Sequence, residues 1–282
     1  MATIDFHQHL WPEPLVEALR NRPAPPRIVD SRLELVSGSF PFESDAHVLA
    51  NRLAELDRDG IDTAVVCLQP TLAVPLPQEL VEAYHEGILR IRDEADGRIV
   101  ALAAGAALDG FAGACVPAPA LLDLDRLAPL LDELLERGQL LFIHPGPEAG
   151  TRSDPAWWAA GVDYVGQMQV AYAGWLADGA SRWPGLPVVF AILAGGAPIQ
   201  LERLAGRGLD VRSVLEADVY FDTASYGSRA LELCLATYGV GRIVYGSDVP
   251  VIDPRPTLRQ VRRFGAAVTA ALCEDNPSRL LA

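Results

Sequence analysis

The sequence predicts an α/β protein built as a (β/α)8 TIM barrel, and three observations support this fold. Eight short apolar runs of β type recur along the chain, separated by segments with apolar residues every three or four positions. Most of these runs are continuously apolar, as in parallel strands that are buried on both faces. The length of 282 residues suits one barrel of this kind, so we expect a single domain over residues 1–282.

Each predicted strand is followed by turn residues or by a helical segment. The predicted strands are Thr3–His7, Thr63–Leu68, Arg98–Ala104, Gly113–Pro117, Leu140–His144, Pro187–Leu193, Val219–Asp222 and Arg242–Tyr245. Helices are predicted within residues 46–60, 76–97 and 124–138, where apolar residues follow the helical period and a glycine ends the pattern. A doubly wound open sheet is the alternative fold, but no GxGxxG motif follows the first strand.

Two segments depart from a regular barrel. Residues 21–45 contain the stretches RPAPP and SGSFPF and are too long for an ordinary turn after the first strand. We therefore predict an insertion that forms a lid or a pocket wall. The third and fourth strands are separated by about eight residues, fewer than a parallel crossover requires. This abbreviated third βα crossover should lack a normal helix, and we expect the insertion or a second subunit to cover the exposed surface.

The charge of the chain restricts its partners. Acidic residues outnumber basic residues by 37 to 23, which gives a net charge of −14 at pH 7. Nucleic acids and anionic membrane surfaces are also negatively charged, so neither is expected as a partner. A small-molecule substrate is the expected partner, and a homo-oligomer remains open.

Cysteine usage and the N-terminal sequence predict a cytoplasmic location. The four cysteines are far apart without a CxxC pair, as expected for reduced, buried thiols, and the N-terminus lacks a basic segment followed by an apolar one. The apolar stretch from Ile99 to Leu122 is interrupted by glycines and prolines, so it predicts two buried strands rather than a membrane span. The cysteines are Cys67, Cys115, Cys234 and Cys273.

Candidate metal ligands occur at the C-terminal ends of the predicted strands. His7 and His9 are two residues apart at the end of the first strand, so both side chains face inward. His144 ends the fifth strand, and Asp248 follows the eighth strand, which adjoins the first when a barrel closes. The pair of His7 and His9 alone is also typical of polar residues that leave a strand, and His144 alone is also typical of a buried core histidine. The four together predict a site for one divalent metal.

Motifs at five strand ends resemble those of the amidohydrolase superfamily. They are HxH, FIHPGP, LAGGAP, FDTASYG and YGSDVP, at strands one, five, six, seven and eight, and the closing EDNPSRLLA also matches. The similarity runs from residue 3 to the C-terminus and is nearest to the amidohydrolase-related family typified by aminocarboxymuconate-semialdehyde decarboxylase. It implies that His7, His9, His144 and Asp248 bind the metal. It also implies either non-oxidative decarboxylation or hydrolysis of lactones or amides.

The chain departs from this family at strand six. The family usually has AHLGGG there, with a histidine that accepts a proton beside the metal-bound water. Here the stretch reads AILAGGAP, so Ile192 occupies the place of that histidine. No arginine in the insertion can be matched to a family substrate-binding arginine. Because Ile192 cannot accept a proton, Asp248 is the expected catalytic base.

Four residues are predicted to contact a substrate. Trp11 follows the histidine pair and His47 lies near the insertion, although packing or a surface position also explains each of them. Ile192 would make the pocket drier, and Arg229, after the seventh strand, would hold a substrate carboxylate. The aromatic helix that begins at Trp157 is interpreted as core or as a subunit contact rather than a substrate platform.

The leading functional prediction is a metal-dependent hydrolase of a small amide, lactone or cyclic imide. A divalent ion lowers the pKa of bound water to about 7 and polarises a carbonyl group. The first alternative is a non-oxidative decarboxylase of an aromatic or enoic acid, which cationic residues around the pocket would favour. The second is a metal-binding barrel without catalysis. The ligand set suits Zn²⁺ first, with Mn²⁺, Fe²⁺ or Co²⁺ as alternatives.

Overall fold

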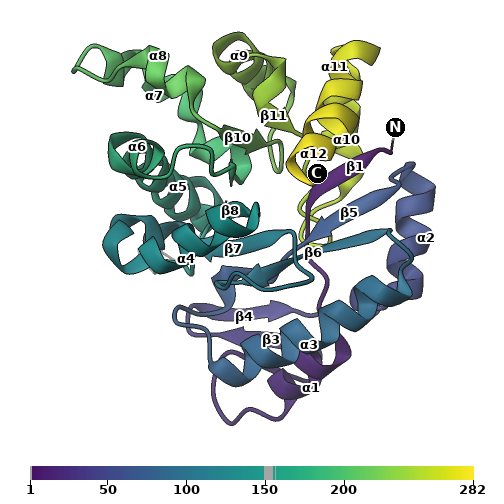
Figure 1. Cartoon of the computed structure of the whole chain (residues 1–282). Coiled ribbons are helices and arrows are strands. Elements are labelled where there is room, and N and C mark those ends of the chain that lie inside the picture. Colours follow the sequence, from purple (N-terminus) through teal and green to yellow (C-terminus); the bar gives the residue numbers. More distant parts are fainter. Residues whose placement is uncertain (1, 149–154, 156) are drawn as a thin grey trace.

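The computed structural model of the chain, which describes residues 2–148, 155 and 157–282, has an eight-stranded parallel barrel at its centre (Figure 1). The strands are arranged around the barrel in their order along the chain. This confirms the predicted (β/α)8 fold. The strands of the barrel are β1 (Ile4–Gln8), β5 (Thr63–Val66), β6 (Ile99–Ala104), β7 (Gly113–Pro117), β8 (Leu140–His144), β9 (Val188–Phe190), β10 (Val219–Asp222) and β11 (Ile243–Val244).

Backbone hydrogen bonds between the first and last strands close the barrel. Three of them, with lengths of 2.7–2.8 Å, join β1 to the residues that follow β11. The ladder therefore continues past the end of β11 and holds residues 245–249 beside β1. The donors are the amides of Phe6, Asp248 and His9, and the respective acceptors are the carbonyls of Tyr245, His7 and Val249.

Helices follow most of the strands and surround the barrel (Figure 1). The helices predicted within residues 46–60, 76–97 and 124–138 are α2, α3 and α4, and helical residues run continuously over 158–182, where one long helix is predicted. The helices are α1 (Glu13–Arg20), α2 (Leu49–Asp59), α3 (Gln78–Glu94), α4 (Leu124–Arg137), α5 (Tyr164–Gly174), α6 (Ala180–Arg182), α7 (Ala197–Ala205), α8 (Val211–Glu216), α9 (Ser228–Tyr238), α10 (Pro254–Arg262), α11 (Ala266–Ala270) and α12 (Asn276–Leu280).

The insertion after β1 folds as a small antiparallel sheet. Its strands are β2 (Arg27–Val29), β3 (Arg32–Leu35) and β4 (Gly38–Pro41), paired in that order. The sheet lies beside α1 and α3 at the lower end of the view in Figure 1. The predicted insertion is thus confirmed, and it is a regular element rather than an irregular loop.

The third crossover lacks a helix, as predicted, because residues 105–112 form turns between β6 and β7. Phe111 is 6% exposed and packs edge-on against His85 of α3, with ring centroids 5.2 Å apart. The side-chain amide of Gln139 donates to the carbonyls of Leu108 and Phe111, both at 2.8 Å. The loop and α3 therefore cover this surface. The described contacts assign this cover to the loop and α3, and the expected cover by the insertion or by a second subunit stays a prediction.

The predicted sixth strand, Pro187–Leu193, is too long at its C-terminal end. The strand β9 ends at Phe190, because Ile192, Leu193 and Ala194 all have left-handed backbone angles, with φ of 47°, 48° and 50°. A β-strand requires negative φ values, so this turn ends the ladder. The other predicted strands agree with the structure within two residues at each end.

The remaining predictions about burial agree with the structure. The stretch Ile99–Leu122 forms β6, β7 and the turns around them. Among the described residues, no helix is both long and apolar enough to cross a membrane. All four cysteines are buried and free of disulfides, as predicted.

We predict that Phe111→Ala lowers the free energy of unfolding by about 3–5 kcal/mol, because it leaves a cavity where a helix would otherwise pack. The measurement is urea unfolding followed by circular dichroism. Leu122→Ala is the control, since Leu122 is 66% exposed and its truncation should cost within about 0.5 kcal/mol. Equal stability losses for the two variants would show that Phe111 does not seal the shortened crossover.

Candidate metal centre

Three histidines and one aspartate converge at the C-terminal end of the barrel. His7 and His9 come from the end of β1, His144 ends β8, and Asp248 follows β11. One potential ligand atom from each of the four lies within 4.8 Å of those of the others. His7 and His9 point to the same side because side chains two apart on a strand share a face. Closure of the barrel brings Asp248 beside them.

The hydrogen bonds of the three imidazoles orient their Nε2 atoms toward one another. Each Nδ1 atom faces an oxygen acceptor, so Nδ1 carries the proton and Nε2 carries the free lone pair. This arrangement is typical of metal-binding histidines, whose second nitrogen donates to a carboxylate or a backbone carbonyl. The contacts of Nδ1 are His7 to Asp222 Oδ2 at 2.7 Å, His9 to the Cys67 carbonyl at 3.0 Å and His144 to the Pro145 carbonyl at 2.9 Å.

The distances within the cluster fit a divalent metal ion. The Nε2 atoms of His7 and His9 are 3.2 Å apart, and His9 Nε2 lies 3.0 Å from Asp248 Oδ1. Ligands at about 2.0–2.1 Å from a tetrahedral ion are separated by about 3.3 Å. Two lone pairs at this spacing repel each other unless a cation lies between them. The donor set and its spacing therefore suit a metal.

Electrostatic interactions within the cluster favour an ionised carboxylate and attract positive charge, which a proton on the imidazoles or a divalent ion that displaces it can supply. Burial lowers the pKa of His7, but the adjacent Asp222 carboxylate outweighs this effect and raises it to about 10. Burial, together with the nearby charges of His7 and His9, lowers the pKa of His144 well below its ordinary value. Burial raises the pKa of Asp248, yet the hydrogen bond with His9 and the imidazole charges bring it below its ordinary value.

Asp222, at the end of β10, is a buried residue of the site that the sequence prediction missed. Its Oδ2 accepts from His7, while its Oδ1 accepts from the amides of Ile192 and Ala224, both at 2.9 Å. The backbone at Gly246 packs directly against Asp222, because a Cβ atom at position 246 would lie only 3.0 Å from the Asp222 Cβ. The signal in the sequence is an aspartate that ends the apolar strand in FDTASYG.

A cavity of about 580 Å³ opens onto the four clustered side chains. Most of its other lining residues are aromatic or aliphatic, and none of the lining residues that the structure describes is an arginine or a lysine. The predicted contact Arg229 is exposed on α9 and is not among these residues. The lining beyond the cluster includes Gln69, Thr71, Trp157, Tyr164, Val165, Ile192, Tyr226, Val251 and Ile252.

Ile192 lines this cavity, at the place where the sequence predicts it. A β-branched residue with positive φ is an outlier in proteins, and strained backbone of this kind concentrates at functional sites. The hydrogen bond from the Ile192 amide to Asp222 holds the turn. The turn places an apolar side chain, rather than a proton acceptor, beside the cluster.

Trp11 and His47 lie beside a neighbouring hollow rather than in this cavity. They stack on each other with ring centroids 5.0 Å apart, and His47 Nδ1 accepts from the Trp11 amide at 3.1 Å. The Trp11 indole donates to Gln69 Oε1 at 2.6 Å, and Gln69 lines both spaces. Burial lowers the pKa of His47 to about 3, with further lowering from Arg52 and His9. His47 is therefore a neutral wall residue.

A parallel barrel with three histidines and an aspartate gathered at the C-terminal ends of its strands defines a class of metal-dependent enzymes. The chain belongs to the amidohydrolase family, whose sequence model matches residues 4–282. The family suggested by the motifs is thereby confirmed. No curated protein sequence matches the chain significantly.

Solved structures share the fold at low sequence identity. The IDCase of Metarhizium anisopliae, in apo form, is 19% identical, with a TM-score of 0.81 over 99% of this chain and 97% of the other. A 2,6-dihydroxybenzoate decarboxylase bound to 2,6-dihydroxybenzoate is 15% identical, with a TM-score of 0.75 over 100% and 98% of the two chains. The 5-carboxyvanillate decarboxylase of Novosphingobium aromaticivorans, with manganese and 4-hydroxy-3-methoxy-5-nitrobenzoic acid, is 17% identical, with a TM-score of 0.71 over 99% and 96%.

We predict that Asp222→Asn weakens binding of Zn²⁺ or Mn²⁺ by about 10- to 100-fold. An asparagine has one acceptor oxygen, so it cannot accept from both His7 and the backbone amides of the strained turn. Titration against a chelating dye measures the affinity. Asp218→Asn is the control, because Asp218 lies just before the same strand and pairs with Arg242 at the surface. Unchanged affinity in Asp222→Asn would mean that Asp222 does not orient His7.

We predict that His47 makes the protein less stable as the pH falls from 7 to 5. Its folded-state pKa of about 3 lies below the unfolded value of about 6.5. The unfolded chain therefore takes up a proton that the folded chain refuses, and stability is lost as the pH falls below 6.5. Urea unfolding at several pH values should show a smaller loss for His47→Asn, whose side-chain oxygen still accepts from Trp11. Parallel stability curves for the two proteins would contradict the predicted burial of a neutral imidazole.

Proposed function

We propose that the protein is a metal-dependent decarboxylase that releases CO2 from a small aromatic carboxylic acid. Hydrolysis comes first in the prediction from sequence, but the apolar cavity and the decarboxylases among the structural neighbours support the alternative better. The observation that carries the proposal is the position of Ile192. An apolar residue beside the metal ligands excludes water from the place where the carboxylate would lie, and loss of CO2 requires no attacking water.

The shape and polarity of the cavity suit an aromatic acid. Tyr164, Tyr226 and Trp157 offer rings along its walls, and Val165 and Ile192 offer aliphatic surface. Flat apolar rings bind favourably against such walls, with a few polar groups fixing their orientation. The carboxyl group of the acid then lies at the polar end, among the histidines and Asp248.

The scarcity of charge around the cavity favours loss of CO2. A carboxylate that leaves as neutral CO2 loses its charge during the reaction, so removal of water from the carboxylate destabilises the starting state more than the transition state. The cationic side chains that would favour a decarboxylase are not found, since the described lining contains no arginine or lysine, so the positive charge must come from a metal ion. A divalent ion, when bound, supplies the positive charge that holds the carboxylate and stabilises negative charge developing on the substrate.

Asp248 is the residue that we assign to proton transfer. It is the one carboxylate among the described residues that line the cavity, and its side chain is 14% exposed there. The bond between the ring carbon and the carboxyl carbon breaks, CO2 leaves, and a proton takes its place on the ring carbon. Asp248, which is ionised at rest, accepts the proton that the carboxyl group of the acid loses and delivers it to the ring carbon as CO2 leaves. His9 contacts the Oδ1 atom and fixes the direction of the carboxyl group.

Assay of the protein loaded with Mn²⁺ or Zn²⁺ on hydroxybenzoates labelled with ¹³C in the carboxyl group tests this proposal. NMR should detect labelled CO2 or bicarbonate, together with the phenol. Asp248→Asn should lower the rate by about 10²- to 10⁴-fold, the range for a positioned acid or base. Asp253→Asn is the matched control, because Asp253 caps α10 at the surface and does not line the cavity.

Two results would overturn the proposal. One is turnover of lactones or amides without CO2 release from any acid, which would restore hydrolysis as the function. The other is full metal occupancy without turnover on either panel, which would favour a barrel that binds metal without catalysis.

A further inference from the structure

A second hollow of about 380 Å³ lies beside the metal cavity, between the insertion and the barrel. Four residues line both spaces, so the two are neighbouring parts of one opening. The shared residues are Gln69, Thr71, Tyr164 and Val251. One wall of the hollow comes from the strands of the insertion, with Leu33, Leu35 and Phe40, and another is formed by the rings of Trp11, Phe42 and His47.

The alternation of residues in the insertion sheet builds its apolar wall. Leu33 and Leu35 are two apart on β3 and therefore share one face, and Phe40 of β4 pairs opposite Leu33. The intervening Glu34 pairs with Arg27 at 2.6 Å. The insertion thus turns an apolar face toward the hollow. The ion pair of Glu34 and Arg27 lies on the opposite face of the sheet.

The second wall of the hollow is a stack of three rings. Phe42 lies 5.4 Å from Trp11 and 5.4 Å from His47, measured between ring centroids, with interplanar angles of 24° and 13°. Since His47 is neutral, this wall carries no charge. The hollow is therefore lined by apolar or uncharged rings on one side and by leucines and Phe40 on the other.

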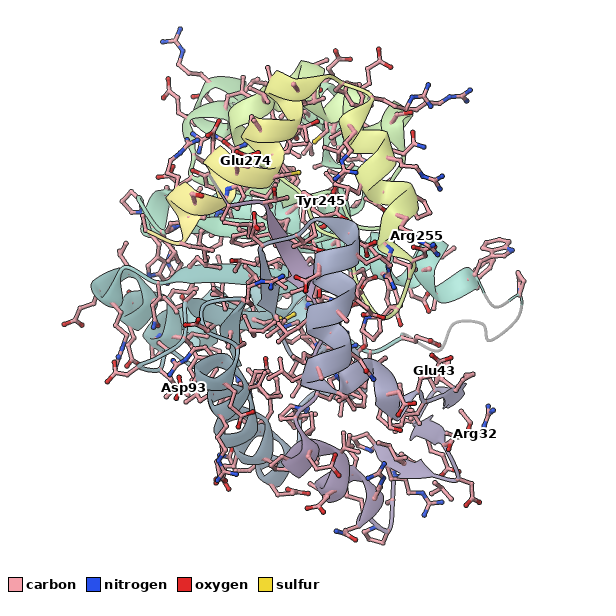
Figure 2. All side chains as sticks on the ribbon, turned by 90° about the vertical axis from the view of Figure 1, so that its right-hand side faces the viewer. Arg32, Glu43, Asp93, Tyr245, Arg255 and Glu274 are labelled. Carbon is pink, nitrogen blue, oxygen red and sulfur yellow. The ribbon has the colours of Figure 1, made fainter. Side chains whose placement is uncertain are left out.

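The charged groups that line the hollow are acidic. Glu43 and Glu148 are among its lining residues, and no arginine or lysine of the described chain is. Glu43 lies at the outer edge of the molecule in Figure 2. A second carboxylate on the substrate would be repelled here, whereas an uncharged apolar group would not.

The volume of the opening exceeds the needs of a single-ring acid. Pockets of about 300–1,000 Å³ hold drug-sized ligands, and the metal cavity of about 580 Å³ already falls in this range without the second hollow. We propose that the second hollow is a substrate arm, which binds an uncharged aryl group attached to the acid whose carboxylate lies at the metal centre. This inference rests on the proposed function and specifies its substrate as a two-ring monocarboxylic acid.

Calorimetric binding to the Mn²⁺-loaded protein tests the arm without turnover. The probes are benzoate, 3-phenoxybenzoate, 4-phenoxybenzoate and 4,4′-oxydibenzoate, which has a second carboxylate at its far end. At least one phenoxybenzoate should bind roughly 10- to 100-fold more tightly than benzoate, as expected for burial of one phenyl ring. The dicarboxylate should lose this gain because its far end meets Glu43 and Glu148.

Variants of the insertion test whether the gain in affinity from the second ring comes from contacts in the second hollow. Leu35→Glu should abolish it, and the milder Leu33→Ala should reduce it several-fold. Val36→Glu is the matched control, because Val36 is 93% exposed at the adjacent turn and the gain should persist there. Circular dichroism and metal content establish that each variant is folded and loaded.

Equal affinities for benzoate and both phenoxybenzoates, or a gain that survives Leu33→Ala and Leu35→Glu unchanged, would overturn the arm. Failure of the proposed function gives a different result. If the protein binds phenoxybenzoate through the arm but releases CO2 from no acid, the arm is supported and the proposed decarboxylation is contradicted. If the protein decarboxylates one-ring acids but a second ring adds no binding affinity, decarboxylation is supported and the arm is contradicted.

Discussion

The backbone ladder between β1 and the residues after β11 is the constraint on which the metal centre depends. It joins residues separated by almost the full length of the chain, and one of its hydrogen bonds runs from the Asp248 amide to the His7 carbonyl. The same bonds that close the barrel therefore set the spacing of Asp248 from His7 and His9. Metal binding and barrel closure should stabilise each other, because a ligand that binds the folded state preferentially adds to its stability.

Asp222 connects the metal ligands to the shape of the cavity. One of its oxygens orients His7, and the other holds the amide of Ile192 at the start of the left-handed turn. A single buried carboxylate thus fixes a metal ligand and the apolar residue that replaces a catalytic base. The cavity that results combines a polar end with apolar walls, and the proposed release of CO2 rests on this combination.

The sequence predicts the barrel and the convergence of the four candidate ligands well, because both follow from local patterns. Apolar runs identify the strands, and the rule that active sites lie at the C-terminal ends of barrel strands selects His7, His9, His144 and Asp248. Asp222 is harder to predict, since its role depends on which residues the closed barrel places beside it. The turn at Ile192 is missed because apolar residues normally continue a strand, and tertiary hydrogen bonds override that preference here. The separation of Trp11 and His47 from the metal cavity depends on how the insertion packs, which no local pattern encodes.

A crystal structure of the metal-loaded protein, with anomalous scattering data collected at the edge of the bound metal, is the most direct test of the metal centre. We expect one ion at full occupancy, bonded to Nε2 of His7, His9 and His144 and to the carboxylate of Asp248, at about 2.0–2.2 Å if the ion is zinc. The Nδ1 atom of His7 should retain its hydrogen bond to Asp222. An ion bound elsewhere, or any of the four side chains turned away from it, would contradict the assignment of this site.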